Sequence, residues 1–436
     1  MAKTDAKSNF GVRGWIFVIY SFLTFFFTTA TSDSISNLAL PALCEKYGWV
    51  YENMVSWKSV WGWITVIFLA ACGQLLRKIS PKKTATVLAL IYGVGAILLP
   101  HVSAKAIFIL IYGITGIGAT VWGQQLNGAL TSNWFPRKKG LVIGWTTAGF
   151  PLGSGLGVLL YNLISRGGQN MPLVYHIYGG IIVILGLVVA FCITDYPEQC
   201  GCFPDNDKNM TREQADAILA QAIEASKKSI WTPKKMLSIK ESWFIAISNG
   251  LSLFFCGTMS VLIPRLMAAG FSMQQAIPIM TVTAVLGGVG SYVMGLIDTK
   301  WGPKNAMIFM DILAIVASIL NIISWRPGIY IAIVFTGMVL GGSANLLMSL
   351  ITSMWGRYSF INAHGVLLPI NQLLGSAGTI TVAQVAARYS YSGAYIVVGI
   401  VSLLSLLFIL PVKEDSILKY EKEAGYERPE LHDGLE

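Results

Sequence analysis

Two stretches, GQLLRKISPK at residues 73–82 and GLIDTKWGPK at residues 295–304, place a glycine, two lysines and a proline in the same register. The offset between them is 222 residues. TSNW at 131–134 matches TSMW at 352–355 with an offset of 221, and the same offset sets Gly144 on Gly365. Pro41 and Gly48 correspond in the same way to Pro264 and Gly270. An offset shared by several motifs indicates an internal duplication.

Long apolar runs surround these motifs. Residues 107–126 and 329–354 contain no Lys, Arg, Asp or Glu, and the whole chain is 54% hydrophobic and 12% charged, against roughly 25% charged residues in soluble domains. About 20 apolar residues form a helix that crosses a bilayer, and only helices satisfy their backbone there segment by segment. The sequence predicts an all-α membrane protein with spans at 14–38, 56–77, 84–102, 106–132, 140–164, 173–194, 242–266, 275–298, 304–324, 328–354, 361–386 and 391–411.

The duplication divides these twelve spans into two pseudo-symmetric six-helix bundles, residues 1–194 and 241–411. Basic residues concentrate in the segments that a cytoplasmic N-terminus would place inside, which favours both termini in the cytoplasm. All but seven of the 31 Lys and Arg residues lie on that side. The seven expected outside are Lys46, Lys58, Lys105, Arg166, Arg265, Arg326 and Arg388.

A polar linker at 195–240 joins the two bundles. Thr211 followed by Gln214 is a capping-box pattern, and the apolar residues that follow at helical spacing predict an amphipathic helix on the cytoplasmic side. Cys200 and Cys202 in this linker are interpreted as incidental rather than metal-binding. The charged tail at 412–436 is expected to be disordered.

Several function classes are disfavoured by the sequence. The net charge of +9 comes from basic residues at span ends rather than from one patch, so no nucleic-acid partner is expected. No Gly-x-x-x-x-Gly-Lys loop is present, which disfavours an ATP-driven pump. No nucleophile or metal constellation suggests an enzyme, and no cofactor is expected.

The turn after spans two and eight resembles that of the major facilitator superfamily, which reads roughly Gly-x-x-x-Asp-Arg-x-Gly-Arg-Lys. The resemblance covers essentially the whole chain and implies alternating access between two bundles. It also implies that both copies of the turn act in gating, although the first has Arg at the Asp position and the second has its Asp displaced by one residue. The residues concerned are Gly73, Arg77, Lys78, Gly295, Asp298 and Lys300.

Residues 133–145, NWFPRKKGLVIGW, are similar to the oxalate/formate and monocarboxylate branch of that superfamily, as is the segment Tyr196–Asp207. Organic-anion carriers of gut anaerobes, including carriers proposed for bile acids, are also similar. Oxalate carriers hold a dianion with basic residues in spans eight and eleven. Here those spans have none before Lys300 and Arg388, which favours a monoanion or a larger amphipathic solute.

Polar residues in spans one, four, seven, ten and eleven are the candidate binding groups. Gln124 and Asn345 are related by the 221-residue offset and are expected to face each other near the midplane, where amides suit a carboxylate or a hydroxylated ring. The alternative is a hydrogen bond that only joins helices. Weaker candidates at plausible depths are Asn249, Asn371 and Gln372. Asn127 lies one turn from Gln124 and is a further candidate, with packing alone as its alternative.

Three charged residues in or near spans are also candidates. Asp33 in span one is the candidate proton carrier, and its alternative is a hydrated residue near the outer end. Arg265 either attracts an anion or pairs with Asp33, or it anchors span seven at the interface. Asp311 in span nine is expected near the cytoplasmic interface.

Together these features predict a secondary transporter in the cell membrane that carries a small, monocarboxylate-like organic anion, coupled to protons or to a counter-anion. Two alternatives stay open. One is proton-coupled efflux of amphipathic drugs, and the other is uptake of larger carboxylates such as bile acids.

Overall fold

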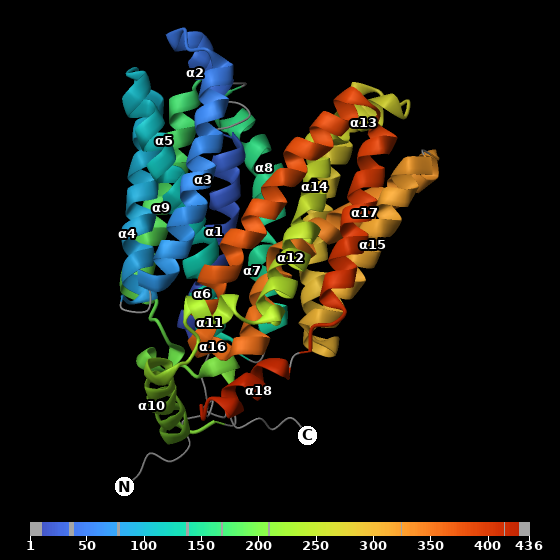
Figure 1. Cartoon of the computed structure of the whole chain (residues 1–436). Coiled ribbons are helices and arrows are strands. Elements are labelled where there is room, and N and C mark those ends of the chain that lie inside the picture. The colour runs from blue at the N-terminus through green and yellow to red at the C-terminus, as the bar shows by residue number, and fades with distance from the viewer. Residues whose placement is uncertain are drawn as a thin grey trace.

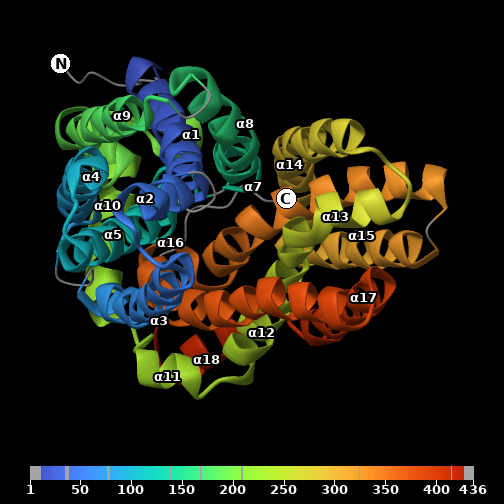
Figure 2. The same cartoon turned by 90° about the horizontal axis from the view of Figure 1, so that it is seen from above.

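The computed structural model describes residues 11–34, 39–75, 79–136, 139–166, 169–207, 210–323, 325–413 and 415–426. Within these ranges the regular elements are all helices. They form two bundles that lie side by side in both views (Figure 1, Figure 2). The predicted all-α membrane fold of two bundles is confirmed.

The first bundle contains the helices before the linker. They are α1 (Gly11–Ser34), α2 (Leu40–Tyr47), α3 (Tyr51–Leu75), α4 (Pro81–Leu98), α5 (Lys105–Thr120), α6 (Asn127–Trp134), α7 (Lys139–Thr147), α8 (Gly149–Ile164) and α9 (Met171–Cys192). A π-helical turn, Val121–Leu126, joins α5 to α6 within one continuous span.

The linker and the second bundle follow. Their helices are α10 (Arg212–Lys228), α11 (Pro233–Leu237), α12 (Lys240–Phe254), α13 (Leu262–Ala268), α14 (Met273–Trp301), α15 (Pro303–Ile323), α16 (Arg326–Arg388) and α17 (Tyr391–Ile409), with α18 (Ser416–Glu423) in the tail. A 3₁₀ segment, Phe255–Val261, joins α12 to α13. We call the end of the molecule that carries α10, α11 and α18 the terminal end (Figure 1).

Ten helical segments in the described residues are long and apolar enough to cross a membrane. The two remaining predicted spans are α3, which has a shorter apolar core, and α7 with α8, which follow each other with a turn at Ala148. Spans ten and eleven both belong to α16, which departs from helical geometry at Gly356, where φ is 70°. Glycine adopts this left-handed conformation without the steric cost that a Cβ brings.

The structure differs from the predicted boundaries after span one. The described part of α1 ends at Ser34, and the separate short helix α2 begins at Leu40. Pro41 in its first turn suits a new helix start rather than a helix interior.

The expectation of a disordered tail is wrong for residues 416–423. They form α18, whose Ile417 and Glu421 are buried. The indole of Trp231 in the linker donates a hydrogen bond of 2.7 Å to the Glu421 carboxylate. A helix of this length is marginal alone, so this docking stabilises it.

The predicted amphipathic helix of the linker is α10. Its capping box is confirmed, because the Thr211 backbone donates to Gln214 at 2.9 Å and the Gln214 backbone donates to the Thr211 hydroxyl at 3.2 Å. Ala215 and Ile218 on its apolar face pack against Phe203 and Met210.

The bundles meet most closely where α7 and α8 pack against α14. A Cβ added to Gly144 would lie 2.7 Å from the Ser291 carbonyl oxygen and 3.1 Å from the Gly295 Cα. Helices come this close only where side chains are absent or small. Nearer the terminal end, the hydroxyls of Ser132 and Thr352 join α6 to α16 at 2.9 Å.

Candidate functional site

A pair of glutamines bridges the two bundles. The Gln372 amide in α16 donates a hydrogen bond of 2.7 Å to the Gln124 side-chain oxygen. Gln124 lies ten residues before Trp134, the terminal-end residue of α6, which corresponds to about 15 Å along a helix and hence to roughly half of a membrane's hydrocarbon thickness. Both glutamines are half-buried, whereas the neighbours of Gln124 from Val121 to Leu126 are buried. At this depth in the bundle, the two glutamine side chains are therefore the polar groups that stay partly accessible.

The π-helical turn Val121–Leu126 decides where Gln124 points. Such a turn inserts an extra residue into an α-helix and is frequent at functional sites. The π-turn therefore changes the angular position of Gln124 relative to the rest of its span. No sequence feature predicted this turn.

A second amide pair adjoins the first. The Asn371 side chain, next in sequence to Gln372, donates a hydrogen bond to the Asn249 side-chain oxygen in α12. The Asn249 amide nitrogen is buried and has no hydrogen-bond partner among the residues that the structure describes. A buried donor without a partner costs free energy, so this group is suited to a ligand oxygen or a water. We call Gln124, Gln372, Asn371 and Asn249 the amide cluster.

Asn345 does not face Gln124 as the offset led us to expect. Its side chain is buried and donates to the carbonyl oxygen of Ser291 at 2.9 Å. The Ser291 hydroxyl in turn lies 2.8 Å from that of Thr147, so Asn345 supports the contact between α14 and α7. The duplication relates backbone positions, but the π-turn is in span four, whereas α16 is α-helical at Asn345. The two side chains therefore point differently.

Asn127 is fully engaged inside the first bundle. Its oxygen accepts from the Ser21 hydroxyl at 2.8 Å, and its nitrogen donates to the Ser21 carbonyl at 3.1 Å. It fixes α6 against α1.

Arg265 in α13 is also held within its own bundle. Only 4% of it is exposed, and it donates to the Asn321 carbonyl in α15 at 2.5 Å. Asp33 falls in the last turn of α1, but its side chain lies outside the described residues. The expected pairing of the two is therefore not addressed by the structure.

The second of the two turns predicted to act in gating lies against the first bundle. Asp298 is buried, and a Cβ added to Gly140 would meet its carboxylate oxygen at 2.6 Å. Gly140 is the second residue of α7, and a negative charge is favourable at a helix N-terminus. Gly295 packs against the same helix, whereas Lys300 is exposed, with its ammonium 5.5 Å from the Trp301 ring.

The first of the two turns predicted to act in gating lies only partly within the described residues. Gly73 lies in α3, and Arg77 and Lys78 fall outside the described residues. The described part is held by Asp195, which the sequence analysis did not single out. Its carboxylate accepts from the Ser80 hydroxyl and, at 2.7 Å, from the Lys82 backbone. The acid lies over 100 residues from both partners, so no local pattern indicates the contact.

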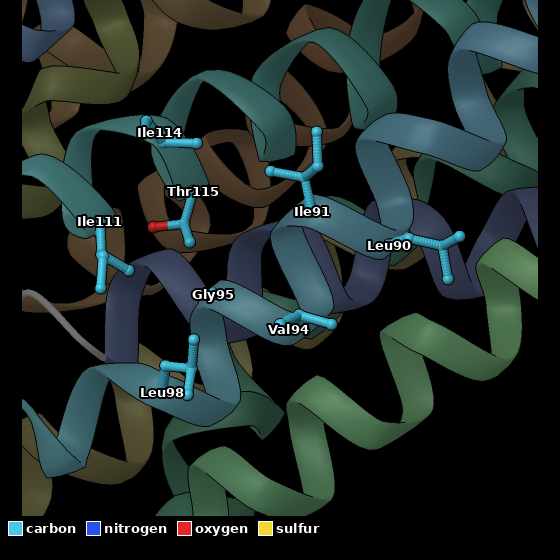
Figure 3. Close-up of a pocket in the computed structure, with 8 residues that line it drawn as sticks. All are labelled: Leu90, Ile91, Val94, Gly95, Leu98, Ile111, Ile114 and Thr115. Carbon is cyan, nitrogen blue, oxygen red and sulfur yellow. The ribbon is translucent and has the colours of Figure 1, made fainter.

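One groove of about 390 Å³ lies between α4 and α5, away from the amide cluster (Figure 3). Its wall is aliphatic apart from one threonine, and its members belong to predicted spans. It offers no group that would orient an anion. The lining residues are Leu90, Ile91, Val94, Gly95, Leu98, Ile111, Ile114 and Thr115.

Comparison with known proteins agrees with this architecture. Residues 22–379 match the Major Facilitator Superfamily, while no curated protein matches the chain. The solved structure of the human organic anion transporter MFSD10 is similar with a TM-score of 0.67 and 12% identity, over 91% of this chain and 99% of that one. The E. coli fucose:proton symporter is similar with a TM-score of 0.65 and 14% identity, over 90% and 97%.

The proton:xylose symporter XylE is similar with a TM-score of 0.66 and 16% identity, over 95% of this chain and 98% of that one. Likeness at these identities shows the fold. The family match covers most of the chain. The protein therefore belongs to the Major Facilitator Superfamily and is a membrane transporter rather than an enzyme.

Proposed function

We propose that the protein is a secondary active transporter of a small organic anion, monocarboxylate-like in size and charge. It works by alternating access and is driven by protons or by exchange for a counter-anion. The observation that carries the proposal is the Gln124–Gln372 hydrogen bond, a half-buried polar contact between the two bundles near mid-span. A solute bound there touches both moving parts.

The chemistry of the amide cluster favours a solute that carries one negative charge. Amide N–H groups donate to a carboxylate, and the buried Asn249 nitrogen has a free donor. Two guanidinium or ammonium groups would be expected for a dianion, and spans eight and eleven lack them near this depth. Asn345 and Asn127 support the site through the contacts that they make with Ser291 and Ser21.

The coupling and gating roles follow the same scheme. In this proposal Asp33 carries or steers a proton at the outer side, and Arg265 attracts the anion to the outer mouth. Gly295, Asp298 and Lys300 form one gating turn, and the matching turn contains Gly73, Arg77 and Lys78. The terminal end faces the cytoplasm, with both termini inside and the protein in the plasma membrane.

The test is uptake into proteoliposomes of a panel of labelled carboxylates, with and without an inward proton gradient. We expect gradient-stimulated or exchange-dependent uptake of a monoanion. Gln124→Ala and Gln372→Ala should raise KM, whereas Gln274→Ala, an exposed glutamine at the start of α14, should not. Asp33→Asn should abolish gradient stimulation if coupling uses that residue.

Other results would identify the alternatives. Uptake of bile acids in place of small carboxylates would extend the substrate class to larger amphipathic anions. Transport of amphipathic amines without any carboxylate would contradict the proposal and support drug efflux.

A further inference from the structure

Asp311 is a carboxylate deep inside the second bundle. It lies in α15, eight residues from the terminal-end residue Pro303, or about 12 Å along the helix. Its exposed fraction is 0%. A buried carboxylate is costly unless it is neutralised or paired with a cation. Its expected position near the cytoplasmic interface stays a prediction, because burial among helices does not measure depth in the membrane.

Serine hydroxyls from two other helices surround this carboxyl group. Ser252 of α12 lies 2.7 Å from one carboxylate oxygen, and Ser405 of α17 lies 2.7 Å from the other. The two hydroxyls are 2.8 Å apart. The Ser405 hydroxyl also lies 2.8 Å from the backbone carbonyl oxygen of Ser248. The Ser248 hydroxyl in turn donates to the backbone carbonyl oxygen of Ser405 at 3.0 Å.

Counting protons shows that this group of oxygens has two protons fewer than it has short contacts when Asp311 is ionised, and one fewer when it is protonated. The four short contacts, at 2.7 to 2.8 Å, involve the hydroxyls of Ser252 and Ser405. Each hydroxyl has one proton to donate, so two of the four contacts would hold none. A proton on Asp311 supplies a third donor and allows Ser405 to turn its own proton to the Ser248 carbonyl.

No cation neutralises Asp311 among the described residues. Its side-chain partners are the two serines, and no charged group interacts with it. The ionisable residues on the packed helices lie elsewhere. Among the side chains that the structure describes, those on α12, α14, α15 and α16 are Lys240, Glu241, Tyr292, Asp298, Lys300, Lys304, Arg326, Tyr330, His364 and Arg388, and those on α17 are Tyr391 and Tyr395.

Lys304 lies on the same face of α15, seven residues or about two turns from Asp311. Its ammonium donates to the Leu410 carbonyl at the end of α17 at 2.8 Å. Lys304 is therefore engaged at the end of α17, and the hydrogen-bond partners of Asp311 are the two serines.

The buried acid adjoins the amide cluster through α12. Ser252 and Asn249 are three residues apart and so occupy neighbouring positions on one helix face. Asn249 pairs with Asn371, and the following residue, Gln372, pairs with Gln124. Occupancy of the cluster and the hydrogen bonds of Asp311 therefore involve the same helix.

We propose that Asp311, with Ser252 and Ser405, is a proton-binding site whose occupancy is coupled to solute binding at the amide cluster. The inference rests on the proposed function, because the proton bound here is the one that crosses with the anion. Water on one side delivers the proton to a carboxylate oxygen, and the same oxygen returns it to water on the other side. This assigns coupling to span nine in addition to the candidate Asp33.

The first measurement does not depend on the substrate. Infrared difference spectra of the full-length protein in lipid at neutral pH should contain the C=O stretch of a protonated carboxyl group, and this band should shift in D2O. We expect Asp311→Asn to remove it, whereas Asp33→Asn keeps it. Survival of the whole band in Asp311→Asn, or its absence from the wild type, would overturn the proposal.

A serine pair provides a second set of variants that retain the carboxyl group, in case Asp311→Asn does not fold. Ser405→Ala removes a hydrogen bond to Asp311 and should move the band. Ser402→Ala is the matched control, because Ser402 is equally buried on α17 and its hydroxyl has no partner. Equal spectra for the two variants would overturn the proposal.

Transport provides the functional measurement. In Asp311→Asn, uptake with an inward proton gradient should fall to the rate measured without one, while anion exchange continues. Stimulation by sodium in place of protons, or unchanged proton stimulation, would overturn the assignment. If the wild type transports no organic anion but the carboxyl band is lost in Asp311→Asn, the proposed substrate fails and the proton site stands.

Discussion

Gln124 and Gln372 are two neutral side chains joined by a hydrogen bond across the bundle interface. A hydrogen bond of this kind contributes about 1 kcal/mol net, and a double-mutant cycle isolates such a pairwise contribution. We expect Gln124→Ala, Gln372→Ala and the double variant to give a coupling free energy of 0.5 to 1.5 kcal/mol, approximately. The measurement is thermal unfolding in detergent without substrate. Strictly additive effects would show that the pair is not formed in the protein's resting state.

The second prediction at this scale concerns Cys200, which is half-buried in the linker. A hydrogen bond from the Cys202 thiol, with help from Thr194 and Arg13, lowers the pKa of Cys200 to about 5 despite partial burial, and the pKa of Cys202 is raised. Thiolates are the reactive form. Alkylation of Cys200 by iodoacetamide should therefore stay constant from alkaline pH down to about 6 and fall as the pH drops through about 5.

Cys202→Ala is the variant that checks the cause. Without the neighbouring thiol, the pH at which Cys200 reacts half-maximally should move upward, toward the usual value of a free cysteine of about 8.5. A wild-type profile that already rises around pH 8 would contradict the assignment. Peptide mass spectrometry distinguishes Cys200 from the other five cysteines.

Helix α7 depends on Gly144 for its approach to α14. A Cβ at this position would lie 2.7 Å from the Ser291 carbonyl oxygen, and backbone gives way less easily than a side chain. Gly144→Ala should weaken the contact and increase the labelling of a Ser132→Cys reporter by a membrane-impermeant maleimide at the terminal end. Gly116→Ala on α5, where a Cβ meets nothing within 4 Å, should leave labelling unchanged. Equal labelling in both variants would mean that the helices separate without using this contact.

Helix α18 is docked in part by a buried hydrogen bond from Trp231 to Glu421. A hydrogen bond to a charged group contributes about 1.5 to 3 kcal/mol. Glu421→Ala should release the tail and increase its cleavage by a protease added on the side of the membrane that the terminal end faces. Glu423→Ala is the control, since this residue is 61% exposed and pairs only loosely with Lys419. Identical cleavage of the two variants would show that α18 docks without the Trp231 contact.

The whole molecule transports only if the bundles separate at the terminal end during the cycle. Cysteines at 132 and 352, in a chain without the six native cysteines, should form a cross-link because the native hydroxyls lie 2.9 Å apart. Oxidation should then stop uptake, and reduction should restore it. Cysteines at 21 and 131, where hydroxyls within the first bundle lie 3.2 Å apart, should have no such effect. Uptake that survives the first cross-link would contradict rocking about this interface.

At the scale of the whole molecule, the spans could be predicted from the sequence, but the contacts between distant residues could not. Bilayer thickness fixes the length of apolar runs, so the spans were predictable to within a few residues. The depth of Gln124 was predictable from its place in a span, but its partner was not, because the π-turn changes the direction of the side chain. Asp195 and Glu421 make contacts with residues more than 100 positions away, and such pairs leave no local pattern.

The bend at Gly356 has a mechanical consequence. Spans ten and eleven are joined there with almost no intervening chain, so the link has no slack. Thr352, which meets the first bundle at the terminal end, and Gln372, which meets it at mid-span, lie on the two arms of this bend. A displacement of one arm therefore moves the other directly, whereas α9 and α12 are separated by the much longer linker. Closure of the bundles at the terminal end and occupancy of the amide cluster at mid-span are thereby mechanically linked.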